Sequence, residues 1–170
     1  MTAADKDTTT VVVERRVAAS PGRVWEAITD LPDLPRMLSA VTRVEVLTDG
    51  VFGEGTRWRE TRRMLGREAT EEMTVTACEP PDRYVTLAES HGMRYVSEIT
   101  LHPAAGTGPA AGAGSGPPAT VLRMTFSARR ADGRAPGPLS RLFTRLGTRA
   151  VARALAKDLS DIAATVESRV

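Results

Sequence analysis

The chain has 170 residues, 41% hydrophobic and 26% charged, which is typical of one globular domain large enough to bury a core. Its formal net charge of +2 is too small to indicate a nucleic-acid partner. In addition, no basic run is interleaved with stacking aromatic residues. A single cysteine, Cys78, excludes an intramolecular disulfide, and with two histidines it argues against a zinc site. We therefore expect no metal and no cofactor.

The N-terminal residues and the absence of long apolar stretches predict a soluble, cytoplasmic protein. Met1–Thr10 is polar and lacks the apolar core of a signal peptide, and no stretch is apolar enough to span a membrane. We expect a cytoplasmic protein in which residues 1–170 form one domain and residues 1–8 form a disordered tail.

The first part of the chain predicts a strand, two short helices and a second strand. Thr8–Val17 is rich in β-branched residues and alternates loosely, as a strand does. Ser20 followed by Pro21 is a helix N-cap with proline at the first helical position, and Pro35–Ser39 predicts another brief helical turn. Val41–Thr48 predicts the second strand.

A hairpin centred on Leu65–Gly66 is the most informative stretch. If these residues form a two-residue turn, the strands on either side have a fixed register. One face then pairs Arg63 with Glu68, Arg59 with Glu72, Thr61 with Thr70 and Arg57 with Thr74, as a solvated face would. The other face pairs Trp58 with Met73, Thr56 with Val75, Arg62 with Ala69 and Glu60 with Glu71. Its apolar pairs predict that this second face points inward.

A second hairpin follows, with strands at Arg83–Ser90 and Met93–Leu101 and a turn at His91–Gly92. Two assignments of its inner face stay open. If the pair Glu89 and Arg94 lies outside, the inner residues are Tyr84, Ala88, Tyr95, Ile99 and Leu101, and the exposed ones are Val85, Leu87 and Val96. Residues 103–118 are Gly, Pro and Ala rich and predict a flexible loop. Ala119–Ala128 is the last strand, with Leu122, Met124 and Phe126 inward.

The C-terminal stretch Leu139–Val166 predicts an amphipathic helix of about 28 residues, roughly 40 Å long. Read in steps of four, the row that starts at Leu139 is apolar or small throughout, and the row that starts at Leu142 has Asp158 as its one polar member. A third row is basic and consists of Arg141, Arg145, Arg149, Arg153 and Lys157. This basic row predicts a solvated face; the alternative is transient contact with an anionic membrane surface.

This order predicts an α+β domain in which a seven-stranded antiparallel curved sheet wraps a long C-terminal helix, with two short helices after the first strand. The chain resembles the START-like helix-grip (SRPBCC) superfamily, in its polyketide cyclase/dehydrase and lipid-transport branch. The resemblance rests on VERRVAASPGRVWEAITD, GEGTRWRETRRMLGREATEEMTVTACEPPDRYV and TVLRMTFSA, and covers roughly Val11 to Val166. Many members carry an aromatic residue in the second short helix, where this chain has Arg36 and Met37.

The resemblance implies a cavity between sheet and helix that holds a hydrophobic small molecule such as a lipid, polyketide or isoprenoid. Our candidate ligand-binding residues are Trp58, Met73, Tyr95, Met124, Phe126, Leu142, Phe143 and Leu146, for which the alternative role is ordinary core packing. Glu60, Arg62 and Glu71 are harder to explain as core, because buried charges are costly unless paired. The alternative is that their strand ends splay and the groups reach water.

Two function classes therefore stay open. The first is a binding or transfer module, acting as a monomer or weak dimer. The second, which the family name implies, is a cyclase or dehydratase-like enzyme in which Glu60, Glu71, Arg62 and His91 orient a poly-carbonyl chain and move protons. His91 in a turn is alternatively a solvated surface residue. A role in binding a protein partner is a third class, for which no exposed motif argues.

Overall fold

The computed structural model describes residues 8–64, 66–90, 92–105, 117–130 and 138–169, with the backbone alone at residue 64 and residues 138–146. The strands are β1 (Thr9–Val17), β2 (Val41–Val46), β3 (Arg57–Met64), β4 (Arg67–Glu79), β5 (Arg83–Ser90), β6 (Met93–Pro103) and β7 (Thr120–Arg130). The helices are α1 (Pro21–Thr29), the 3-10 turn η1 (Leu31–Asp33), α2 (Leu34–Met37) and α3 (Pro138–Ser168). This order of elements confirms the predicted one.

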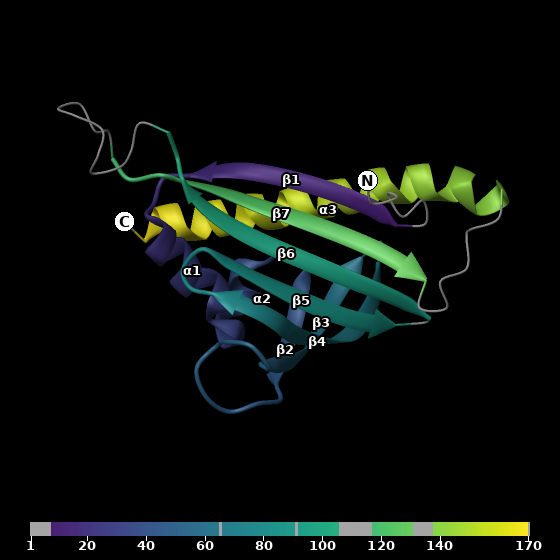
Figure 1. Ribbon diagram of the computed structural model, residues 1–170, viewed down its shortest axis with the longest axis horizontal. Coiled ribbons are helices and arrows are strands. Elements are labelled where there is room, and N and C mark those ends of the chain that lie inside the picture. The colour runs from purple at the N-terminus through teal and green to yellow at the C-terminus, as the bar shows by residue number, and fades with distance from the viewer. Residues whose placement is uncertain (1–7, 65, 91, 106–116, 131–137, 170) are drawn as a thin grey trace, which may run out of the picture.

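The strands form one antiparallel sheet in the order β1-β7-β6-β5-β4-β3-β2. Figure 1 shows α3 running along one face of this sheet, near β1, with α1 and α2 at the end where the chain terminates. The register shifts between Val41 and Arg43 on β2, and between Val75 and Ala77 on β4. Such bulges bend a strand and increase its twist. The curved sheet with one long helix confirms the predicted helix-grip fold.

The hairpin of β3 and β4 has the predicted register. Trp58 lies opposite Met73, Glu60 opposite Glu71 and Arg62 opposite Ala69. On the outer face, Arg63 pairs with Glu68 at 3.2 Å, and the hydroxyls of Thr61 and Thr70 lie 2.8 Å apart. Trp58 is 4% exposed, so the face that carries it points into the molecule.

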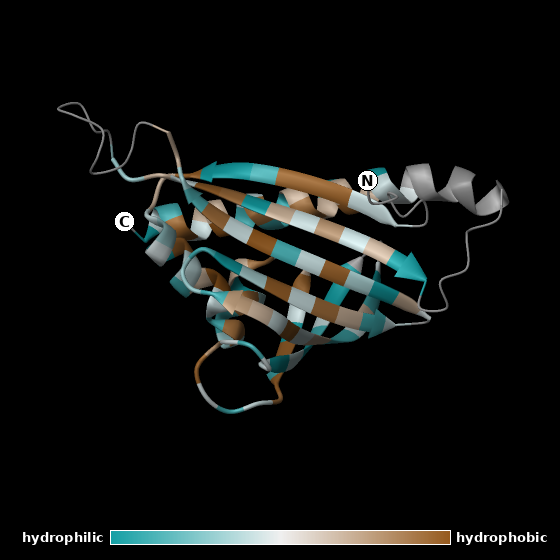
Figure 2. Cartoon of the chain, viewed as in Figure 1, coloured by the Kyte–Doolittle hydropathy of each residue, from teal (hydrophilic) through white to brown (hydrophobic). Residues whose placement is uncertain are grey.

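The hairpin of β5 and β6 resolves the face that the sequence left open. Tyr84, Ala88, Ile99 and Leu101 are buried, so their face is the inner one. Val85, Leu87 and Val96 lie on the outer face, where neighbouring side chains leave them half-buried. Figure 2 shows the resulting alternation of hydrophobic and hydrophilic residues along these strands.

Two predicted boundaries need correction. β2 ends at Val46, two residues before Thr48, and the outward turn that follows carries the fully exposed Val51. The predicted loop at 103–118 begins too early, because Pro103 ends β6 opposite Thr120 and Ala104 is buried. The Ala104 amide donates to the Ala119 carbonyl at 2.8 Å, which continues the pairing of the strands beyond the expected end. Residues 106–116, and residues 1–7 of the predicted tail at 1–8, lie outside the described residues.

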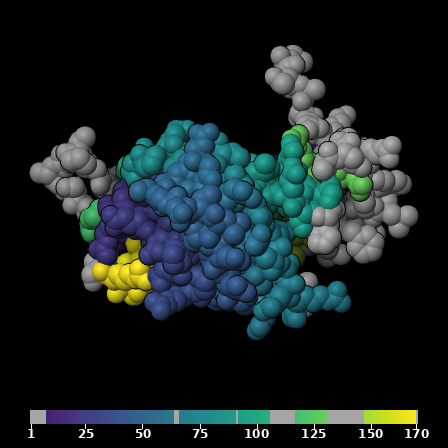
Figure 3. Space-filling model, turned by 90° about the horizontal axis from the view of Figure 1, so that it is seen from below, coloured from purple at the N-terminus to yellow at the C-terminus, as the bar shows by residue number. Residues whose placement is uncertain are grey.

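Polar contacts fasten the C-terminal half of α3 to the N-terminal elements. Asp161 accepts from the backbone amide and the hydroxyl of Ser39 at 3.0 and 2.7 Å. Arg169 pairs with Asp33 at 2.7 Å, and Glu167 accepts from the amide of Ala18 at 2.9 Å. Figure 3 shows the yellow end of α3 lying against the purple N-terminal segment. These contacts fix which face of α3 meets the sheet.

Candidate functional site

A cavity of about 360 Å³ lies between the inner face of the sheet and α3. This volume is within the range of about 300–1,000 Å³ typical of small-molecule sites. Its lining is mostly apolar and comes from every layer of the fold: Ile28, Leu31, Leu34, Met37, Leu38, Trp58, Glu60, Arg62, Ala69, Glu71, Met73, Tyr84, Thr86, Tyr95, Ser97, Ile99, Met124, Phe126, Val151, Ala154, Leu155, Asp158, Leu159 and Ile162.

One end of the cavity is closed by an aromatic cluster. The ring of Phe52, from the loop between β2 and β3, lies 5.1 Å from that of Tyr84 and 6.3 Å from that of Trp58. Trp25 of α1 packs edge-on against both Phe52 and Tyr84. Leu31 and Leu34 add buried side chains from the short helices. The described residues at this end therefore leave little access to solvent.

Other residues of the lining are only half-buried, among them Glu71, Met124 and Val151. Tyr95 and Phe126 stack, with ring centroids 5.9 Å apart and an interplanar angle of 22°. The lining therefore includes fully buried side chains such as Trp58 and half-buried ones such as Val151.

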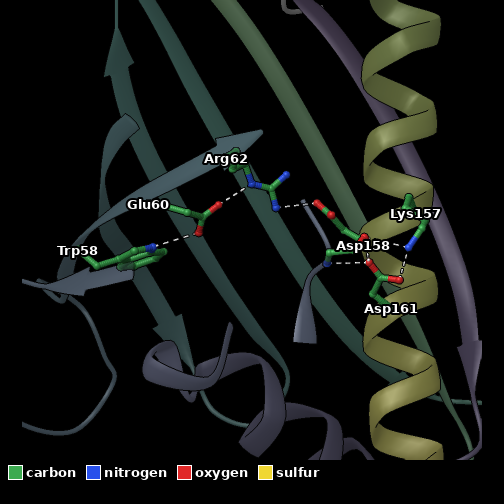
Figure 4. Close-up of polar contacts among 7 residues, drawn as sticks. Trp58, Glu60, Arg62, Lys157, Asp158 and Asp161 are labelled. Carbon is green, nitrogen blue, oxygen red and sulfur yellow. Dashed lines mark hydrogen bonds and ion pairs between the residues drawn. The ribbon is translucent and has the colours of Figure 1, made fainter. Parts of the chain in front are cut away.

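A chain of polar contacts runs from β3 to α3, as Figure 4 shows. The indole Nε1 of Trp58 donates to Glu60 Oε2 at 3.2 Å, and Arg62 Nε donates to Glu60 Oε1 at 2.5 Å. The same guanidinium donates through Nη2 to Asp158 Oδ2 at 2.7 Å. One arginine therefore holds a carboxylate from the sheet and a carboxylate from the helix, and neither bond uses its Nη1 group.

Asp158 is the most deeply buried charged group of this chain of contacts, at 3% exposure. Its second oxygen, Oδ1, has no hydrogen-bond partner among the described residues. Burial raises the pKa of the Asp158 carboxyl, although the charge and the hydrogen bond of Arg62 act in the opposite direction. An unsatisfied buried oxygen costs free energy, and Oδ1 is enclosed by the surrounding protein atoms.

The neighbouring ionisable groups respond to the same environment. Burial acts to lower the pKa of Arg62, yet the charges of Glu60 and Asp158 raise it, so its guanidinium stays charged. Burial, followed by the charge of Glu60, raises the pKa of the Tyr84 hydroxyl. Burial, followed by the charge of Glu71, raises the pKa of Tyr95. Both phenols therefore stay protonated at neutral pH and can act as hydrogen-bond donors.

The structure brings eight of the twelve predicted site residues into the cavity lining. They are Trp58, Glu60, Arg62, Glu71, Met73, Tyr95, Met124 and Phe126. His91 and the side chains of Leu142, Phe143 and Leu146 lie outside the described residues. Glu60, Arg62 and Glu71 all lie in the lining and are half-buried.

Sequence reasoning missed two parts of the lining. Asp158 was visible as the one polar residue in an apolar row of α3, but nothing local indicates that its partner is Arg62. The buried residues Leu31, Leu34 and Met37 come from the short helices, and only their docking over the cavity reveals their role. Met37 lines the cavity, whereas the side chain of Arg36 is 88% exposed.

Within the described ranges, no three His, Cys, Asp or Glu side chains gather as metal ligands would. No helix in the part of the chain that the structure describes is long and apolar enough to cross a membrane.

Solved structures with the same fold come from distant sequences. A Thermus thermophilus protein superposes with a TM-score of 0.73 at 18% identity, covering 95% of this chain and 99% of that one. The Zhui aromatase/cyclase from a Streptomyces species gives 0.72 at 17% identity, covering 95% of each chain. A norcoclaurine synthase mutant from Thalictrum gives 0.65 at 16% identity, covering 95% and 96%. At such identities the likeness establishes the fold.

The family itself follows from the sequence. No curated protein matches the chain. The model of the family described as polyketide cyclase / dehydrase and lipid transport, however, matches residues 8–167, nearly the whole chain. The protein therefore belongs to the polyketide cyclase/dehydrase and lipid transport family, and it has the helix-grip fold of START-like ligand-binding domains.

Proposed function

We propose that this protein binds a hydrophobic small molecule, such as a lipid, polyketide or isoprenoid, in the cavity between the sheet and α3, and carries it in solution. The observation that carries the proposal is the cavity itself: about 360 Å³ enclosed mainly by apolar side chains. Well-packed interiors rarely leave so large an apolar volume, because an empty cavity costs stability. A bound apolar molecule would recover the contacts that the lining lacks.

The proposal is tested by filling the cavity. Ala154 on α3 lines it, so Ala154→Trp would occupy the space that a ligand needs. Ala156 lies two residues further along the same helix and is exposed, so Ala156→Trp is the matched control. Native mass spectrometry of the purified proteins should find a retained small molecule, or uptake of added Nile red, in the wild type and in Ala156→Trp but not in Ala154→Trp. Equal uptake by all three proteins would refute binding in this cavity.

An enzyme of the cyclase or dehydratase type is the second candidate, favoured by the contacts of Glu60, Arg62 and Asp158. Arg62 Nη1 is available to donate to a carbonyl oxygen, which would stabilise an enolate as the carboxylate of Glu71, also in the lining, takes a proton from the adjacent carbon. The enolate carbon then attacks a second carbonyl, and an acid protonates the new alkoxide. Asp158, whose pKa is raised by burial, is suited to that step. One structural neighbour is named an aromatase/cyclase.

Binding and turnover can be separated with one variant. If the protein is an enzyme, Asp158→Asn should retain uptake of Nile red while losing cyclisation of a linear poly-β-carbonyl thioester, followed by the absorbance of the aromatic product. If the wild type binds such a substrate but leaves it linear, as buffer alone does, the protein is a carrier.

From the sequence we expect a cytoplasmic protein with a solvated basic face on α3, and transient contact of that face with an anionic membrane is the alternative. Arg149 and Arg153 are exposed on α3, whereas the exposed Lys157 already forms an ion pair with Asp161. Sedimentation with vesicles containing phosphatidylserine tests the contact, and a lack of binding at low salt would exclude it.

A further inference from the structure

The charges that line the cavity restrict the chemistry of its ligand. In the described lining, Glu60, Glu71 and Asp158 supply carboxyl groups, and Arg62 supplies the one guanidinium. Arg62 is shared between Glu60 and Asp158, at 2.5 and 2.7 Å. When ionised, Glu60, Asp158 and Arg62 together carry one net negative charge, because two carboxylates face one cation. A guanidinium already bound to two carboxylates is a poor receptor for a third.

The carboxyl group of Asp158 is the buried acidic group of the lining. Asp158 is 3% exposed, lines the cavity, and its Oδ1 has no hydrogen-bond partner among the described residues. In Figure 4 its carboxylate reaches from α3 towards Arg62. An ionised carboxylate only accepts hydrogen bonds, so Asp158 attracts a hydroxyl or ammonium group and repels another carboxylate.

We propose that the cavity selects an apolar molecule whose polar end is a neutral or cationic hydrogen-bond donor, and that it rejects the anion of the same shape. The inference rests on the proposed ligand binding and adds the class of ligand. The group formed by Glu60, Arg62 and Asp158 is the selective element, because its excess negative charge attracts a donor and disfavours fatty-acid-like anions. The rest of the lining supplies apolar contact without regard to charge.

The test compares three probes that share one ten-carbon chain: decanol, decylamine and decanoate. Dissociation constants are measured at pH 7 by displacement of Nile red and by calorimetry. We expect decanol and decylamine to bind at least about tenfold more tightly than decanoate, since one unit of like charge at cavity distances is worth more than about 1.4 kcal/mol. In Asp158→Asn, which removes the excess charge, the preference for decanol over decanoate should fall to about threefold or less.

A matched control separates the local charge from the net charge of the protein. Glu72 follows Glu71 on β4 but lies on the outer face, where it pairs with Arg57 and Arg59. Glu72→Gln changes the net charge by the same amount as Asp158→Asn and should leave the preference unchanged. Glu60→Gln removes the other carboxylate on Arg62 and gives a second measurement should Asp158→Asn fold poorly.

The outcomes distinguish the two proposals. If decanoate binds the wild type as tightly as decanol, or if Glu72→Gln and Asp158→Asn reduce the preference equally, the selection by charge is wrong while ligand binding stands. If neither Nile red nor decanol binds, the proposed function fails and the inference fails with it.

Discussion

Replacing Arg62 tests the central contact between sheet and helix. Arg62→Met keeps much of the side-chain volume but leaves the carboxylates of Glu60 and Asp158 without their shared cation. Breaking a fully buried ion pair from one side costs about 3–5 kcal/mol. Because the Arg62 side chain is 25% exposed and the cavity can admit water, we expect about 2 kcal/mol. In a domain of this size that lowers Tm by roughly 4–8 °C.

The adjacent residue supplies the control. Arg63 lies on the outer face, where its side chain is 64% exposed and pairs at 3.2 Å with Glu68, whose side chain is 52% exposed. Exposed ion pairs of this kind contribute about 0–1 kcal/mol. Urea denaturation of the wild type, Arg62→Met and Arg63→Met at pH 7 should therefore separate the first variant from the other two.

The pH dependence gives a sharper test of the same reasoning. The pKa of Asp158 is already raised by burial, and loss of Arg62 removes the charge that opposes this shift. A carboxyl with a raised folded-state pKa destabilises the protein at high pH and ceases to do so once it is protonated. The loss of unfolding free energy in Arg62→Met, relative to the wild type, should therefore shrink as pH falls from 7 towards about 4. A deficit that is absent at pH 7, or that is the same at both values, would contradict the assignment.

Three further predictions concern single groups of the cavity. Asp158→Asn should match or exceed the wild type in Tm at pH 7, because burial penalises only the ionised carboxyl. The difference in Tm should vanish below the ordinary carboxyl pKa of about 4. A lower Tm of the variant at pH 7 would show that the ion pair with Arg62 outweighs the penalty of burial. Leu159→Ala, at a side chain 1% exposed, should cost about 2–4 kcal/mol in urea denaturation, and a cost under about 1 kcal/mol would mean that the site is loosely packed. Absorbance titration at the tyrosinate band should show neither Tyr84 nor Tyr95 ionising at the ordinary pKa of about 10 while the protein is folded, and a normal titration of Tyr84 would place it in water.

The hairpin of β3 and β4 shows what the sequence can specify. A two-residue turn fixes the register, and the alternation of side chains then assigns Trp58, Glu60 and Arg62 to one face without further information. The long helix can also be predicted from the local sequence, because its apolar rows repeat over many turns. Both features depend on residues that are neighbours in the chain.

The contacts that complete the site depend on tertiary packing instead. Arg62 and Asp158 are 96 positions apart, and either could have been solvated on its own element. Phe52 sits in a loop with no periodic pattern, yet its ring closes the aromatic end of the cavity. The inner face of β5 and β6 was ambiguous because both of its faces carry apolar residues, of which the outer ones are only half-buried. Such features follow from how the elements meet.

The bulge on β4 has a consequence for how this protein can change over evolution. The shift in register between Val75 and Ala77 lies in the main chain, so the concavity of the sheet depends on backbone geometry more than on the side chains that project from it. Substitutions at Met73, Tyr95 or Phe126 can therefore reshape the interior while the strands keep their positions. A lineage that inherits this scaffold can acquire a new ligand through a few point mutations, and chains that are only 17–18% identical can retain the same backbone.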